Sequence, residues 1–177
     1  MEGRRYSFWL ISVKTIVVHT VTYFITGLLA FVFLDYADRF ADPAIRVLMR
    51  QVDDPLVAAG PMLQPLRGIL FGLVFYLLQS EFFEQDKGWL VMWVSLVVLG
   101  IFSTFGPTPG SIEGLIYTNI PVKFQLLGLI EVILQALLFS ALLFWWVKYP
   151  EKKWLNWVMG LAFLLVLLMS SLGVVMG

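Results

Sequence analysis

Residues 154–177 read WLNWVMGLAFLLVLLMSSLGVVMG, and they decide the fold class because no side chain among them carries a formal charge. A helix of this length rises about 36 Å, which is enough to cross the hydrocarbon core of a bilayer, about 30 Å thick. Uncharged apolar segments of this length are typical of transmembrane helices. This stretch therefore predicts an integral membrane protein.

The composition of the whole chain indicates the same class. Of its 177 residues, 60% are hydrophobic and 14% are charged, whereas about a quarter are charged in an ordinary soluble domain. A soluble fold of this size would need more polar surface, and a disordered chain would have fewer apolar residues. The 12 basic and 12 acidic side chains cancel to a formal net charge of zero, so no nucleic-acid partner is expected.

Four further apolar segments precede the last one, each close to the length of about 20 residues that a span needs. The sequence thus predicts an all-α integral membrane protein, built as a single membrane-embedded helical bundle over residues 1–177. Arg67 lies inside the second predicted span, and Glu131 lies inside the fourth. The five predicted transmembrane helices cover approximately residues 8–34, 61–79, 89–105, 122–147 and 154–177.

Basic residues and tryptophans orient the predicted spans. The cytoplasmic face of a membrane protein carries more Lys and Arg, and tryptophan prefers the membrane interface. With five spans, one face receives Arg4, Arg5, Lys87, Lys148, Lys152 and Lys153. The opposite face receives Arg39, Arg46, Arg50 and Lys123. All seven tryptophans lie at or near the first face, so we expect a multi-pass inner-membrane protein with its N-terminus in the cytoplasm and its C-terminus outside.

The longest connection contains an apolar repeat of helical period. Asp42 can cap a helix that begins at Pro43. The apolar positions that follow at i, i+3, i+4 and i+7 are Ile45, Leu48, Met49 and Val52. This pattern predicts an interfacial amphipathic helix over about residues 42–52. It is either a lid over a site or a connector that lies on lipid, and we favour the connector.

A second connection, over about residues 106–121, begins with Gly106-Pro107-Thr108-Pro109-Gly110 and is unusually apolar. Thr108 or Ser111 can cap a short helix in it, and Glu113 is its only formal charge. Non-helical backbone at membrane depth must be buried in protein or line a cavity. The segment is therefore a re-entrant, pore-lining element or a turn with an interfacial helix, and we favour the latter. Thr108, Ser111 and Glu113 are its candidate site residues.

Polar side chains inside the apolar spans are the main functional candidates, because they are costly in a bilayer and face protein or water. We expect Arg67 to pair with Glu131 beside Tyr23, and Gln135 to reach His19. The site is expected in the outward half of the bundle, between the first, second and fourth spans and beneath the 106–121 segment. The predicted buried polar cluster, a ligand or ion path, consists of His19, Thr22, Tyr23, Thr26, Arg67, Glu131 and Gln135.

Several kinds of chemistry find no support in the sequence. The chain has no cysteine and one histidine, which excludes thiolate metal sites and multi-histidine metal sites within one chain. The P-loop, GxSxG and HExxH motifs are absent. No metal, no cofactor and no catalytic residue is therefore assigned.

These patterns favour a small polytopic inner-membrane protein that acts as a subunit of a membrane complex or as a small oligomeric channel or transporter. One alternative is an intramembrane enzyme that acts on a lipid-like substrate with Glu131 or His19 as acid or base, and this reading is less favoured. Another is a structural scaffold without a small-molecule site. The expected partners are membrane lipid and either further copies of the chain or other membrane subunits.

Overall fold

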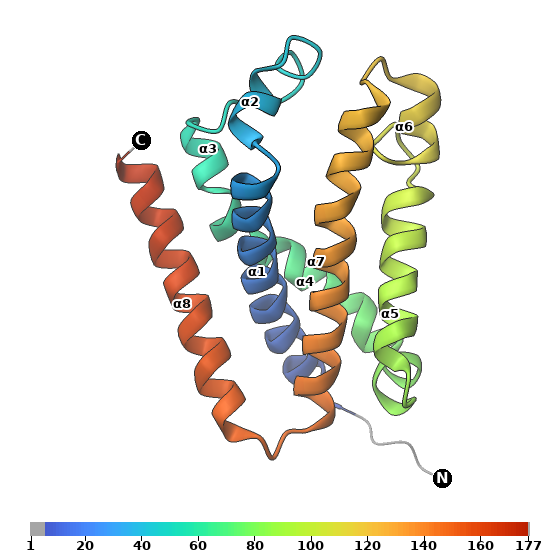
Figure 1. Ribbon diagram of the computed structural model, residues 1–177. Coiled ribbons are helices and arrows are strands. Elements are labelled where there is room, and N and C mark those ends of the chain that lie inside the picture. The colour runs from blue at the N-terminus through green and yellow to red at the C-terminus, as the bar shows by residue number, and fades with distance from the viewer. Residues whose placement is uncertain (1–5, 177) are drawn as a thin grey trace.

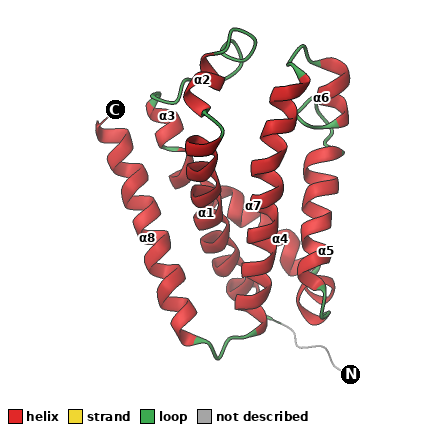
Figure 2. Ribbon diagram, in the orientation of Figure 1, coloured by secondary structure: helices red, strands yellow, loops and turns green. Residues whose placement is uncertain are grey.

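The computed structural model describes residues 6–176, and these form helices joined by turns, with no strand among them (Figures 1 and 2). The all-helical prediction is confirmed. Two π-helical segments, η1 (Ser80–Glu84) and η2 (Val98–Phe102), follow α4 and α5. In chain order the α-helices are α1 (Phe8–Phe33), α2 (Tyr36–Ala41), α3 (Pro55–Ala58), α4 (Gly60–Leu77), α5 (Gly88–Val97), α6 (Ile112–Tyr117), α7 (Val122–Lys148) and α8 (Lys153–Met176).

Three helices, α1, α7 and α8, are long and apolar enough to cross a membrane. They match the first, fourth and fifth predicted spans, and they identify the chain as a membrane protein. The second and third predicted spans correspond to shorter elements, α4 and the continuous helical stretch Gly88–Phe102. Arg4, Arg5 and Gly177 lie outside the described residues.

Helix α1 is the centre of the bundle, in contact with α4, α7 and α8, while α5 packs against α7 (Figure 1). The starts of α1, α5 and α8 lie at the end of the bundle where α7 finishes, and α4 crosses obliquely behind them. The largest cluster of buried apolar side chains occupies this same end. Its members include Ile11, Phe75, Phe83, Met92, Phe139, Leu143 and Leu155.

Two glycines set the close approach of α4 to α1. A Cβ on Gly68 would lie 2.7 Å from the Cα of Ile16, and one on Gly72 would lie 2.9 Å from the Cα of Ser12. Both distances are too short for a side chain. The Gly68–Gly72 spacing therefore serves helix packing, as small residues at i and i+4 do in membrane helices.

The amphipathic helix predicted over residues 42–52 is wrong, because residues 42–49 form successive turns. Asp42 still caps locally, since its Oδ1 accepts a hydrogen bond of 2.9 Å from the Ala44 amide. Farther on, the Gln51 side chain donates to the Phe40 carbonyl at 2.9 Å. A straight helix of this length would span about 16 Å and would carry Gln51 away from α2. The segment instead folds back on itself.

The glycine contacts give a stability prediction. In Gly68→Ala, the added methyl group meets the α1 backbone, so we expect the protein to lose about 1–3 kcal/mol of stability through overpacking. Thermal unfolding in one mild detergent measures the loss. Gly160→Ala on α8 is the matched control, because no atom lies within 4 Å of its added Cβ and alanine favours a helix. Equal melting temperatures for the two variants would contradict the close α1–α4 contact.

Candidate functional site

The carboxylate of Glu131 is the centre of the candidate site. It extends from α7 toward α1 at Gly27, where an added Cβ would lie 3.8 Å from Glu131 Oε1. The hydroxyl of Tyr36, on α2, donates a hydrogen bond to Glu131 Oε2. Tyr36 reaches this position because Asp35, the N-cap residue of α2, adopts the left-handed conformation with φ of 46°, which Asp tolerates better than most residues. A turn at one residue thus supplies the donor for a half-buried carboxylate.

Arg39 lies next to this contact without pairing with Glu131. Its Nη2 donates to the Phe124 carbonyl on α7 at 2.6 Å, and its Cζ lies 5.4 Å from the centroid of the Tyr36 ring. Gly128 leaves room for the guanidinium, since an added Cβ would lie 3.1 Å from Nη2. Burial lowers the pKa of Arg39. Its Nε and Nη1 are buried and have no hydrogen-bond partner within residues 6–176.

Among residues 6–176, no basic side chain forms an ion pair with Glu131. The two ion pairs found in the described part of the chain join Arg50 to Asp54 and Lys148 to Asp86. An ionised carboxylate away from water is stable only when a cation or several hydrogen-bond donors compensate it. Tyr36 supplies one hydrogen-bond donor to Glu131, so the carboxyl group can still bind a further donor or a cation.

A cavity of about 710 Å³ lies beside Glu131. Its walls come from α1, α2, α3 with the segment that leads into it, the start of α4, α7 at Glu131, and α8. Most of the surface is apolar, and the polar side chains on it are Tyr23, Tyr36, Arg50, Glu131 and Ser170. On the other side, a smaller cavity of about 220 Å³ between α1 and α7 also reaches Glu131. The carboxylate therefore borders both spaces.

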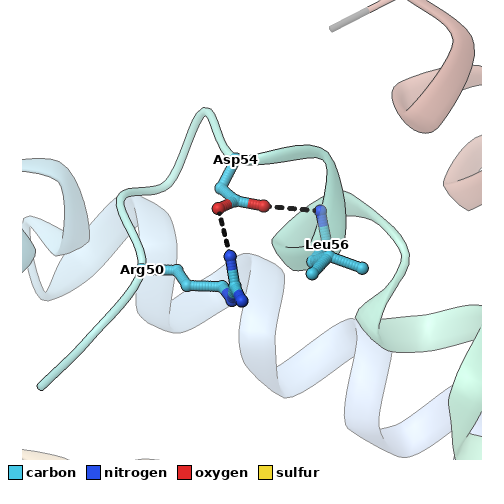
Figure 3. Close-up of polar contacts among 3 residues, drawn as sticks. All are labelled: Arg50, Asp54 and Leu56. Carbon is cyan, nitrogen blue, oxygen red and sulfur yellow. Dashed lines mark hydrogen bonds and ion pairs between the residues drawn. The ribbon is translucent and has the colours of Figure 1, made fainter.

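Arg50 at the large cavity is already neutralised (Figure 3). Its Nη1 lies 2.8 Å from Asp54 Oδ2, while Asp54 Oδ1 accepts a hydrogen bond of 2.8 Å from the Leu56 amide and so caps α3. The hydrogen bond from Arg50, followed by that from Leu56, lowers the pKa of Asp54. With Arg50 paired, Glu131 is the uncompensated charge on the cavity wall.

The predicted pair of Arg67 and Glu131 does not form. Arg67 is exposed, and its Cζ lies 5.5 Å from the centroid of the Phe71 ring. Because Gly68 and Gly72 must face α1, the rotation of α4 turns Arg67 away from α7. The sequence predicted that Arg67 and Glu131 lie at a similar depth in the membrane, but it did not predict the direction in which the Arg67 side chain points.

The predicted contact between His19 and Gln135 is also replaced by another one. His19 Nε2 lies 3.1 Å from Gln64 Oε1 on α4, and its ring packs 5.1 Å from that of Phe139. Phe139 stands one turn beyond Gln135 on α7, so the apolar ring fills the place that the amide was expected to take. His19 is 2% exposed and lines neither cavity.

Of the hydroxyl side chains predicted on α1, some bond to the backbone of the helix and some line a cavity. Thr22 and Thr26 each donate to a backbone carbonyl one turn earlier, at 2.8 Å. Thr26 borders the smaller cavity and Tyr23 borders the larger one. Gln135 is buried and lines neither space. Of the predicted cluster, Tyr23, Thr26 and Glu131 thus meet at the cavities.

The 106–121 segment packs on α7, since an added Cβ on Gly110 would lie 2.6 Å from Leu129, and none of its residues lines either of the two cavities. The predicted site beneath this segment stays a prediction. Of the two predicted caps, Ser111 is the one observed, with its Oγ accepting from the Gly114 amide at 2.9 Å. Thr108 supplies the carbonyl to which that hydroxyl donates. Gln125, which the sequence analysis missed, accepts from the Gly110 amide and donates to the Ile120 carbonyl. Glu113 is half-buried.

Comparison with known proteins adds no relative. No protein-family model matches this chain, and no curated protein or solved structure matches it. The chemistry of the site is therefore inferred from its own residues.

Three residues at the site, Tyr36, Arg39 and Ser170, were not in the predicted cluster.

The Arg50–Asp54 pair gives a prediction about pH. Because the folded pKa of Asp54 lies below its ordinary value of 3.8, the pair contributes stability above that pH and loses it as the pH falls through the folded pKa. In Arg50→Gln, we expect the pKa of Asp54 to rise toward 3.8, measured by NMR titration of labelled aspartate carboxyls. Arg46→Gln, which removes a nearby exposed cation, should leave it unchanged. A similar shift in both variants would contradict a specific pair.

Proposed function

We propose that the protein is a small five-span inner-membrane transporter, or the transport subunit of a membrane complex, that holds an amphipathic molecule in the cavity beside Glu131. The observation that carries this proposal is a large, mostly apolar cavity, of about 710 Å³, with an uncompensated carboxylate on its wall. Ligand cavities typically combine an apolar lining with a few polar groups that fix the orientation of the ligand.

The arrangement of the helices supports five spans. Helix α4 and η1 together extend from residue 60 to residue 84, and α5 continues through η2 to residue 102. The stretch from α5 to η2 runs beside α7, and α4 crosses obliquely behind α1 and α7 (Figure 1). The tryptophans occur near the starts of α1, α5 and α8 and near the end of α7, which lie at one end of the bundle. Such a belt is typical of a membrane interface.

The contacts of the polar residues favour transport over the alternatives. An enzyme that used His19 would need the ring at the cavity, yet His19 is enclosed by Phe71 and Phe139. A protein that serves only as a structural scaffold does not need a large cavity beside an ionisable group, whereas a ligand-binding protein does. A carrier needs both, because its ligand must be held and then released. Further copies or other membrane subunits complete the proposed assembly.

The proposed topology can be tested with single cysteines, because the natural chain has none. Asp53 and Gln85 are both exposed, one in the connection before α3 and the other between η1 and α5. We expect Asp53→Cys to react with a membrane-impermeant maleimide in intact spheroplasts, and Gln85→Cys to react only after permeabilisation, because α4 lies between them as a span. Labelling of both positions without permeabilisation would overturn the five-span topology, and the reversed pattern would overturn its orientation.

The proposed cavity can be tested with a photoactivatable long-chain alcohol, which is amphipathic and uncharged. We expect saturable labelling of the cavity wall at residues 169–173, detected by peptide mass spectrometry. Leu28→Trp should reduce this labelling several-fold, since Leu28 lines the cavity and the larger ring occupies part of it. Leu161→Trp is the matched control, because Leu161 is exposed on α8 and does not line the cavity. Non-saturable labelling, unaffected by Leu28→Trp, would contradict a ligand cavity.

A further inference from the structure

We propose that the molecule held in this cavity is a cationic amphiphile, and that it binds in exchange for a proton on Glu131. This inference rests on the proposed function, since it assigns the chemical class of the ligand to the same cavity. Three observations carry it: the charge of the wall, the aromatic rings that surround the space, and the hydrogen bond that holds the carboxylate.

Glu131 is the one acidic residue among those that line the cavity. Arg50 is paired with Asp54, and Arg67 is exposed and turned toward Phe71. Helix α8 contributes no charged side chain to the wall, while Asp35 and Asp38 on α2 are exposed and do not line it. The groups on the elements packed around Glu131 are Tyr23 on α1, Tyr36 and Arg39 on α2, Arg50 and Asp54 before α3, and Arg67 on α4.

Arg39 is the one cation close to Tyr36 and does not compete for the ligand site. Its guanidinium is held by the Phe124 carbonyl and lies over the Tyr36 ring. Its two remaining nitrogen groups are buried, so a molecule in the cavity cannot touch them. An anionic ligand would therefore find no unpaired cation on the wall of the cavity.

Aromatic rings line the same space. They come from α1 and α2, and a cation over such a ring is stabilised by the negative charge of its face. The rings on the cavity wall belong to Tyr23, Phe24, Phe31, Tyr36 and Phe40. A ligand with apolar groups around one positive charge satisfies both the rings and the carboxylate.

A proton and the cationic ligand exchange at the carboxyl group of Glu131. Without ligand, the carboxyl of Glu131 carries a proton, because an uncompensated carboxylate is costly at this depth. When the cation enters, the O–H bond breaks, the proton leaves to water, and the carboxylate pairs with the cation. The hydroxyl of Tyr36 donates to the same group throughout. Since proton and cation compete for one carboxylate, each binds only when the other has left, which couples their movements.

The test uses two ions of nearly equal size and opposite charge, tetraphenylphosphonium and tetraphenylborate. Binding is measured on the full chain in nanodiscs of zwitterionic lipid, at several pH values, together with proton release in weak buffer. We expect saturable binding of the phosphonium and, at a pH where the carboxyl of Glu131 is protonated, release of one proton per cation bound. In that range the apparent affinity should fall about tenfold for each unit by which the pH is lowered. The borate should not compete for the site.

Variants assign the site to one carboxyl group. Glu131→Gln should weaken phosphonium binding by at least about 30-fold, as expected for loss of one partner from a desolvated charge pair. Glu113→Gln is the matched control, because it removes a carboxylate that lines neither cavity, and it should bind normally. If Glu131→Gln does not fold, Glu131→Asp retains the charge and should keep both binding and proton release.

Two results would overturn the proposal. The first is competition by tetraphenylborate, and the second is phosphonium binding without proton release or unchanged in folded Glu131→Gln. If the uncharged alcohol still labels the cavity wall in either case, the proposed function stands and only the class of ligand is wrong. If the alcohol also fails to label the cavity, the proposed function fails as well.

Discussion

The polar face of α1 is the constraint on which the rest of the structure depends. Ser12, Thr15, His19, Thr22 and Thr26 are all buried on this helix, and in a membrane such groups must face protein or a cavity. The chain meets this requirement by surrounding α1 with α4, α7 and α8. The close approach of α4, allowed by its two glycines, leaves no space for lipid between the helices. At the other end of α1 the helices do not close, and the cavity occupies that space.

The long helices could be predicted from the sequence because apolar length determines them. The spans expected at 8–34 and 122–147 correspond to Phe8–Phe33 and Val122–Lys148 within a residue. Short elements were harder, because α2 and α3 have too few residues for a periodic pattern. Their formation depends on local contacts, namely the left-handed Asp35 and the cap that Asp54 gives to α3. The left-handed Asp35 leaves no pattern in the sequence, whereas Asp54-Pro55 repeats the cap signal of Asp42-Pro43 and was missed.

The candidate site was predicted in part, for a physical reason. Counting residues along a helix gives the depth of a side chain, and depth correctly placed Glu131, Tyr23 and Thr26 in one region. Depth does not give the rotation of a helix about its axis, which turns Arg67 outward and puts Phe139 rather than Gln135 beside His19. One signal was present for a missed residue, since Gln125 is a second glutamine in the predicted span that contains Gln135.

The Tyr36–Glu131 hydrogen bond also constrains how the protein is made. Its two residues are separated by 95 positions in the chain, so α1 and α2 are synthesised long before α7 emerges from the ribosome. An acidic residue near the middle of a span raises the free energy of insertion by about 2.5–3.5 kcal/mol. The apolar remainder of α7 must offset this amount before the hydroxyl is reached. The hydrogen bond can therefore form only after α7 has been synthesised, when Glu131 reaches Tyr36 on α2.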